Sequence, residues 1–160
     1  MHLSPILLFG VTLLLATFAF ALWKGSLAER IGASMNAAAG FVVIALDQIL
    51  PPDLRSIAQL VIDAGLAAGF LFLAIRWASL WLGAAMILQA VQFSLHAYYM
   101  VTETPTAGDW MFARINNADT TLINLVIIGA TVVAIRKRMA DRREAARKAA
   151  VATPEPSAAG

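Results

Sequence analysis

An apolar run that ends abruptly in a basic cluster is the feature that most constrains the fold. The run is Thr121–Ile135, and the sequence Arg136-Lys137-Arg138 follows it directly. An apolar helix of about 20 residues crosses a lipid bilayer, and Lys and Arg are retained on its cytoplasmic side. The junction therefore predicts an integral membrane protein whose last helix ends in the cytoplasm.

The composition supports this prediction. Of the 160 residues, 60% are hydrophobic and only 14% are charged, whereas soluble domains average about 25% charged residues. Because so few charges cannot cover the surface of a soluble domain, the apolar excess is expected to face lipid. The chain has no cysteine, which excludes disulfides, thiol chemistry and iron–sulfur clusters.

The apolar runs predict an all-α integral membrane helical bundle of five transmembrane helices, at residues 4–23, 29–47, 56–75, 78–101 and 117–135. The first run has no basic n-region and is longer than a signal-peptide core, so we expect it to be retained. With the C-terminus cytoplasmic, five spans place the N-terminus outside. Three loop cations and the seven of residues 136–148 then lie inside, and two lie outside, as the positive-inside rule requires. A four-span arrangement, with 29–47 lying in the interface, is the alternative.

Residues that favour turns and loops predict the connections between the spans. Pro51 and Pro52 are expected to break the chain, Arg76-Trp77 to form a tight hairpin, and residues 102–116 to form a polar loop. Beyond the last span, residues 136–150 are rich in Ala, Arg and Lys, which predicts a basic cytoplasmic helix. Residues 151–160 are predicted to be a disordered tail.

Polar side chains inside the predicted spans form a candidate intramembrane cluster, because such groups are costly in hydrocarbon and often mark function. Its members are Asp63, Gln92, His96 and Asn124. Gln92 and His96 share one helix face, and the short connection between their helix and that of Asp63 favours an Asp63–His96 contact. Such a pair would relay protons or hold a quinone or lipid headgroup. Hydrogen bonding between packed helices with no further role is the other reading.

Small residues predict close helix packing. Gly65 and Gly69 form a GxxxG match, and Gly32 and Gly40 lie on a small-residue face of the second span. Such faces pack within one chain or pair with another membrane protein or a second copy.

The basic cluster predicts lipid headgroup binding. Five cations carry this prediction: Arg136, Lys137, Arg138, Arg142 and Arg143. Each cation near a membrane surface adds about 1 kcal/mol of attraction to anionic headgroups. Nucleic acid is not expected as a partner, because no nucleic-acid-binding fold accompanies the patch. With only two histidines and no cysteine, neither a bis-histidine haem nor a zinc site is expected, and no cofactor is predicted.

A few short motifs carry a resemblance. Arg76-Trp77-Ala78-Ser79-Leu80-Trp81 precedes Gln89 and His96, Trp23-Lys24-Gly25 precedes Glu29-Arg30, and Asp63 lies between these segments. Together these motifs, over roughly residues 20–100, resemble a group of small uncharacterised multi-pass membrane proteins of alphaproteobacteria of the sphingomonad and caulobacter type. The resemblance implies a bacterial inner membrane and no particular activity.

Three classes of function stay open. The sequence contains no nucleophile elbow, P-loop, HExxH or dinucleotide motif, which favours a non-enzymatic accessory or assembly subunit. The alternatives are a transport or proton-linked component that uses Asp63 and His96, and a membrane enzyme acting on a lipid or quinone.

Overall fold

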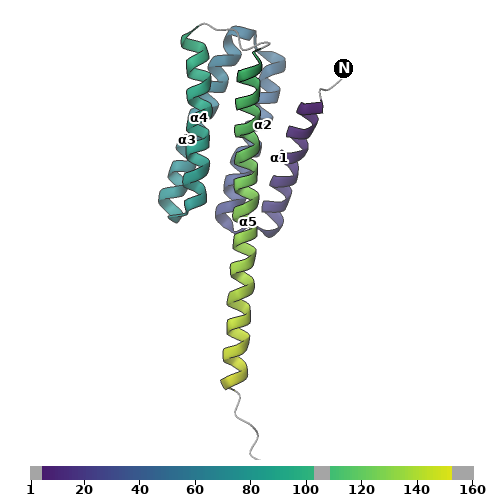
Figure 1. Cartoon of the computed structure of the whole chain (residues 1–160), viewed down its shortest axis with the longest axis vertical. Helices are drawn as coiled ribbons and strands as arrows, with labels where there is room; N and C mark the ends of the chain where they lie inside the picture. The colour runs from purple at the N-terminus through teal and green to yellow at the C-terminus, as the bar shows by residue number, and fades with distance from the viewer. Residues whose placement is uncertain (1–4, 103–108, 153–160) are drawn as a thin grey trace, which may run out of the picture.

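The computed structural model describes residues 5–102 and 109–152, which form α-helices and, within these ranges, no β-strand (Figure 1). The helices are α1 (Pro5–Lys24), α2 (Leu27–Ile49), α3 (Pro52–Trp77), α4 (Leu80–Val101) and α5 (Trp110–Ala152). The predicted all-α fold class is confirmed. The predicted disordered tail lies almost wholly outside the described residues.

Local chemistry sets where the first three helices begin and end. The Glu29 carboxylate accepts hydrogen bonds from the backbone N–H and the hydroxyl of Ser26, which caps the start of α2. Pro52 opens α3, where a missing backbone N–H costs nothing. The hairpin between α3 and α4 falls at Ala78 and Ser79 rather than at the predicted Arg76-Trp77, and Ala78 has a left-handed φ of 47°.

The start of α5 differs from the prediction. Residues 110–116 are helical, whereas the sequence predicted a loop to residue 116. Asp109 Oδ1 accepts hydrogen bonds from the backbone N–H groups of Met111 (2.8 Å) and Phe112 (2.9 Å). This N-cap allows the helix to begin seven residues before the predicted span.

The helices form a closed ring. Each helix packs against the next along the chain, and α5 also packs against α1 and α2. Figure 1 shows α5 continuing well beyond the end of the other helices. The predicted basic helix 136–150 is thus the extension of α5 and not a separate element.

Apolar side chains fill part of the interior and also cover much of the exterior. Phe70 and Leu82 are fully buried between α3 and α4, and Ile127 is fully buried on α5. In contrast, Leu80 is 95% exposed and Ile49 is 77% exposed. An apolar exterior of this kind fits a lipid environment, where such side chains do not contact water.

Four of the described helices are long and apolar enough to cross a membrane, and they lie within α2, α3, α4 and α5. The described part of α1 includes a shorter apolar segment, Leu8–Lys24. These helices therefore support the prediction of a membrane protein. The fifth span and the orientation of the N- and C-termini stay predictions.

Three of the four predicted packing glycines do pack within the chain. A Cβ atom at Gly32 would meet Trp81, one at Gly40 would meet Leu14, and one at Gly69 would meet Met35. Gly65 is different, because a Cβ atom there would meet no described atom within 4 Å. Of the two alternatives predicted for Gly65, packing within the chain has no contact to support it among the described residues, and pairing with another chain stays a prediction.

Candidate functional site

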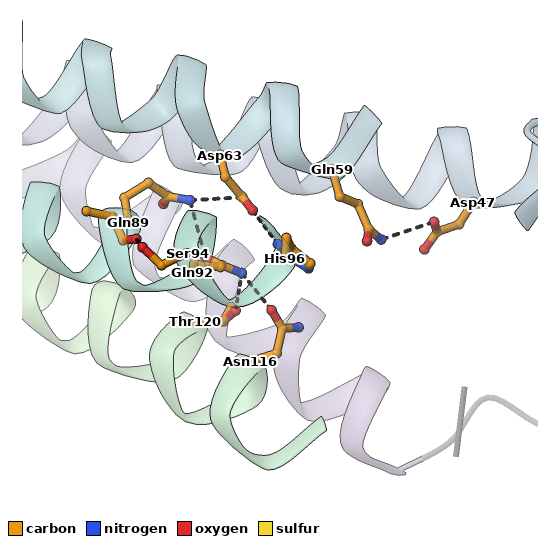
Figure 2. A network of polar contacts seen from close by, with 10 residues as sticks. Asp47, Gln59, Asp63, Gln89, Gln92, Ser94, His96, Asn116 and Thr120 are labelled. Atoms are coloured by element: carbon orange, nitrogen blue, oxygen red, sulfur yellow. Dashed lines mark hydrogen bonds and ion pairs between the residues drawn. The ribbon is translucent and has the colours of Figure 1, made fainter. Parts of the chain in front are cut away.

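Asp63 of α3 and His96 of α4 form a buried pair. The Oδ2 atom of Asp63 lies 2.5 Å from Nδ1 of His96, and each side chain is 7% exposed. Figure 2 shows Asp63 pointing from its helix toward both His96 and Gln89. The short α3–α4 connection brings the two residues to the same depth, as the sequence predicted.

Two glutamines extend this pair across the bundle. Gln89 Nε2 donates to Asp63 Oδ1 (3.0 Å) and to Gln92 Oε1 (3.3 Å). Gln92 Nε2 in turn donates to Asn116 Oδ1 (2.9 Å) and to Thr120 Oγ1 (3.5 Å) (Figure 2). A continuous series of polar contacts therefore joins α3, α4 and α5. Two acceptors fix the orientation of each glutamine amide.

The fourth predicted member, Asn124, lies apart from the pair. Its Oδ1 atom accepts from Asn36 Nδ2 (3.4 Å) and its Nδ2 atom donates to the carbonyl of Thr120 (2.9 Å). Asn124 therefore links α5 to α2 and reaches the Asp63 network only through Thr120. The structure brings together Asp63, Gln92 and His96 and does not place Asn124 in direct contact with them.

Aromatic and charged groups near the start of α5 lie beside the pair. The ring of His96 lies 5.3 Å from that of Phe112, and Tyr99 contacts the other side of Phe112 at 5.0 Å. The Tyr99 hydroxyl donates to Asp109 Oδ2 (3.0 Å). The backbone N–H of Phe112 holds the pKa of Asp109 below its usual value, helped by Tyr99 and opposed by partial desolvation. The cap of α5 thus also positions the ring beside His96.

A cavity of about 390 Å³ lies inside the ring of helices, next to the pair. All five helices contribute to its wall. The polar residues of the wall include Asn36, Asp63, Gln89, Gln92 and Asn116, and apolar residues of α1 and α2 cover much of the rest. Asp63 thus contacts His96 and also faces the cavity.

Sequence reasoning missed several of these groups. Asn116 falls in the predicted loop 102–116, and Asn36 was not among the predicted site residues. Asp119 is 4% exposed and its Oδ2 atom has no hydrogen-bond partner within the described residues. The sequence does contain a signal for Asp119 as a polar residue near the site, because it precedes the apolar run by two residues and is one turn from Asn116.

The five predicted headgroup-binding cations all lie on the extension of α5, and their side chains are exposed. Arg138 is distinct, because its Nη2 atom donates to the backbone carbonyl of Lys24 (2.7 Å). No group of three or more metal-ligating side chains occurs in residues 5–102 and 109–152.

Comparisons with protein-family models, curated proteins and solved structures found no match. The fold and exterior are those of an all-helical protein compatible with a membrane. The resemblance to alphaproteobacterial membrane proteins stays a prediction. Any function must be argued from the site itself.

Proposed function

We propose that the chain is a non-enzymatic membrane protein that binds a small amphipathic molecule in its central cavity and couples binding to protonation of the Asp63–His96 pair. The observation that carries the proposal is the double role of Asp63, which contacts His96 and lines the cavity. A ligand next to the carboxylate alters the electrostatic surroundings of the pair. Asp63 makes its hydrogen bond to His96 with the same carboxylate, so a ligand beside that carboxylate changes how the pair holds its proton.

The walls of the cavity indicate the chemistry of the ligand. Its volume lies within the range of about 300–1,000 Å³ that is typical of small-molecule sites. Val11, Leu14 and Val43 form an apolar surface opposite the polar group of Asp63, Gln89 and Gln92. The matching ligand has an apolar body and one hydrogen-bonding end, as a lipid or a quinol has.

The side chain of Gln89 is buried and only partly hydrogen-bonded. Gln89 Oε1 is excluded from solvent and has no hydrogen-bond partner within the described residues, although Gln89 Nε2 has two. An unpaired buried acceptor costs about 1–3 kcal/mol. The network is therefore not fully paired within the described residues.

A cavity-filling variant tests the binding. The probe is 1-pyrenemethanol, a fluorophore with an apolar body, one hydroxyl and no titrating group, added to the purified chain in detergent. Val43→Phe adds a ring at the cavity wall, whereas the matched control Val42→Phe adds the same ring at a 46% exposed neighbour that does not line it. We expect at least tenfold weaker binding for Val43→Phe and less than a twofold change for Val42→Phe. Equal binding by both variants and the wild type would refute the proposal.

The coupling to protons is tested separately. In the wild type, probe affinity should change between pH 5 and pH 8. The double variant Asp63→Asn/His96→Gln keeps two polar side chains but removes both ionisable groups of the pair, so its affinity should change with pH much less than that of the wild type. A double variant with the pH dependence of the wild type would contradict the coupling but not the binding.

A second candidate is an accessory or assembly subunit, favoured by the outward position of Gly65. A Cβ atom there meets nothing, and Val61, four residues earlier on the same face, is 65% exposed. In this reading, α3 offers a surface to another membrane helix. Gly65→Leu should then leave the fold intact but abolish crosslinking to a partner, whereas Gly83→Leu, also open on α4, should not. Unchanged crosslinking in Gly65→Leu would exclude this face as the contact.

A further inference from the structure

A second cavity, of about 360 Å³, lies where α1 ends beside the extension of α5. It shares no lining residue with the cavity beside Asp63. Its described wall is made by six side chains: Trp23, Lys24, Ile135, Arg138, Met139 and Arg142. Three of these are cations and none is acidic.

The cations are arranged on a fixed frame. Arg138 Nη2 donates to the carbonyl of Lys24 at 2.7 Å, which caps the C-terminal end of α1 and ties α1 to α5. A guanidinium has five N–H donors, so this bond leaves others for a ligand. Arg142 follows Arg138 by four residues and shares its helix face. Lys24 Nζ lies 4.0 Å from the ring centroid of Trp23.

The rest of the pocket is apolar and open to the surroundings of the bundle. Trp23 is 74% exposed, and Met139 is 48% exposed. Tryptophan prefers the boundary between lipid and water, because its ring is apolar and its N–H can hydrogen-bond. Cations and an exposed indole therefore meet at one place, with the apolar helices on one side and the solvated extension of α5 on the other.

We propose that this pocket binds the phosphate of an anionic phospholipid, with Lys24, Arg138 and Arg142 around the phosphate and Trp23 beside the glycerol and acyl region. The proposal does not rest on the function proposed for the Asp63 site. It also narrows the sequence prediction of five headgroup-binding cations. Arg138 and Arg142 line the pocket and Lys24 joins them, whereas Arg136, Lys137 and Arg143 do not line it.

Lipid retention by the full chain in detergent, followed by native mass spectrometry, tests the proposal. The probes are phosphatidylglycerol, phosphatidylcholine and inorganic phosphate. We expect a discrete phosphatidylglycerol adduct, no equivalent phosphatidylcholine adduct, and no displacement by 10 mM inorganic phosphate. Displacement by phosphate at this concentration would show that a free anion, and not a lipid, is the ligand, and would overturn the proposal.

Paired variants distinguish the pocket from general surface charge. Lys24→Gln and Arg142→Gln remove one pocket cation each and should weaken phosphatidylglycerol retention at least fivefold. Arg143→Gln removes the same charge one residue outside the pocket and should change retention less than twofold. Circular dichroism verifies that all three variants remain helical. Equal weakening by Arg142→Gln and Arg143→Gln would show diffuse attraction and would refute a built site.

Discussion

Replacement of Asp63 by alanine is the most direct test of the site. The substitution removes the acceptor that lies 2.5 Å from His96 Nδ1 and the one that receives the Gln89 Nε2 donor at 3.0 Å. A buried polar group left without a partner costs about 1–3 kcal/mol. Gln89 Nε2 keeps Gln92 Oε1 at 3.3 Å, so its loss is at the low end of this range. His96 Nδ1 keeps no partner in the described residues, so its loss is near the high end.

The expected destabilisation by Asp63→Ala is therefore about 2–4 kcal/mol. A competing argument gives a smaller destabilisation, because polar contacts between membrane helices contribute on average about 0.6 kcal/mol when the groups left behind find new hydrogen-bond partners. Two such contacts sum to about 1 kcal/mol. The larger figure should hold because both side chains of the pair are 7% exposed, which leaves little access to substitute partners.

Asp63→Asn provides the matched comparison. The amide keeps one oxygen for Gln89 and offers a donor to a neutral His96 nitrogen, so we expect a loss of roughly 1 kcal/mol. Unfolding of the purified chain by sodium dodecyl sulfate, followed by circular dichroism, measures both variants. Gln59→Ala on the same helix removes only a 3.4 Å contact with Asp47 and serves as control. A loss below 0.5 kcal/mol for Asp63→Ala, or equal losses for Ala and Asn, would refute the reasoning.

Three further predictions concern the α3–α4 hairpin, the cap of α5 and the orientation of the chain in the membrane. Ala78→Gly should stabilise the chain by about 0.5–1 kcal/mol in the same unfolding assay, because relief of a positive φ outweighs the added chain entropy of glycine; destabilisation would contradict this. Asp109→Ala should lower the thermal midpoint of α5 melting more than Asp109→Asn, which keeps a cap acceptor. The pKa of Asp109 is lowered in the folded chain, so the stabilisation by its carboxylate is present above the unfolded pKa of about 4 and is lost as pH falls through the folded pKa. Thermal midpoints at pH 3 and pH 6 should therefore differ more for the wild type than for Asp109→Asn. Equal differences would argue against the cap. Finally, because the chain has no cysteine, Leu50→Cys and Ala146→Cys report orientation: an impermeant maleimide should label the first in intact cells and the second only after permeabilisation, and the reverse pattern would invert the predicted topology.

The sequence predicted contacts between neighbouring helices better than contacts between distant ones. Asp63 and His96 lie on consecutive helices joined by two residues, so a short connection suffices to predict their meeting. The contact of Asn124 with Asn36 spans 88 positions and depends on the packing of α2 against α5. No local pattern encodes that packing, so the sequence did not predict that Asn124 would contact Asn36.

Helix boundaries show the same limit on a smaller scale. Asn116 has low helix propensity and was predicted to lie in a loop, yet it lies inside α5, where Asp109 caps the helix and Asn116 pairs with Gln92. The left-handed conformation of Ala78 could not be predicted, since alanine rarely adopts it. At Asn116 a contact with another helix accompanies a conformation that the local sequence did not predict.

The α3–α4 pair has an apolar end and a polar end, and this arrangement explains how a polar site can persist in the bundle. Near the hairpin, Phe70, Leu73, Leu82 and Ala85 form a buried apolar cluster that holds the two helices together. Asp63 lies seven residues from Phe70, about 10 Å along the helix axis at 1.5 Å per residue. The apolar end therefore fixes the register that places Asp63 opposite His96. Changes at an apolar residue of the cavity wall such as Val43 should for this reason alter binding before they alter the fold, whereas changes at Phe70 should disrupt both together.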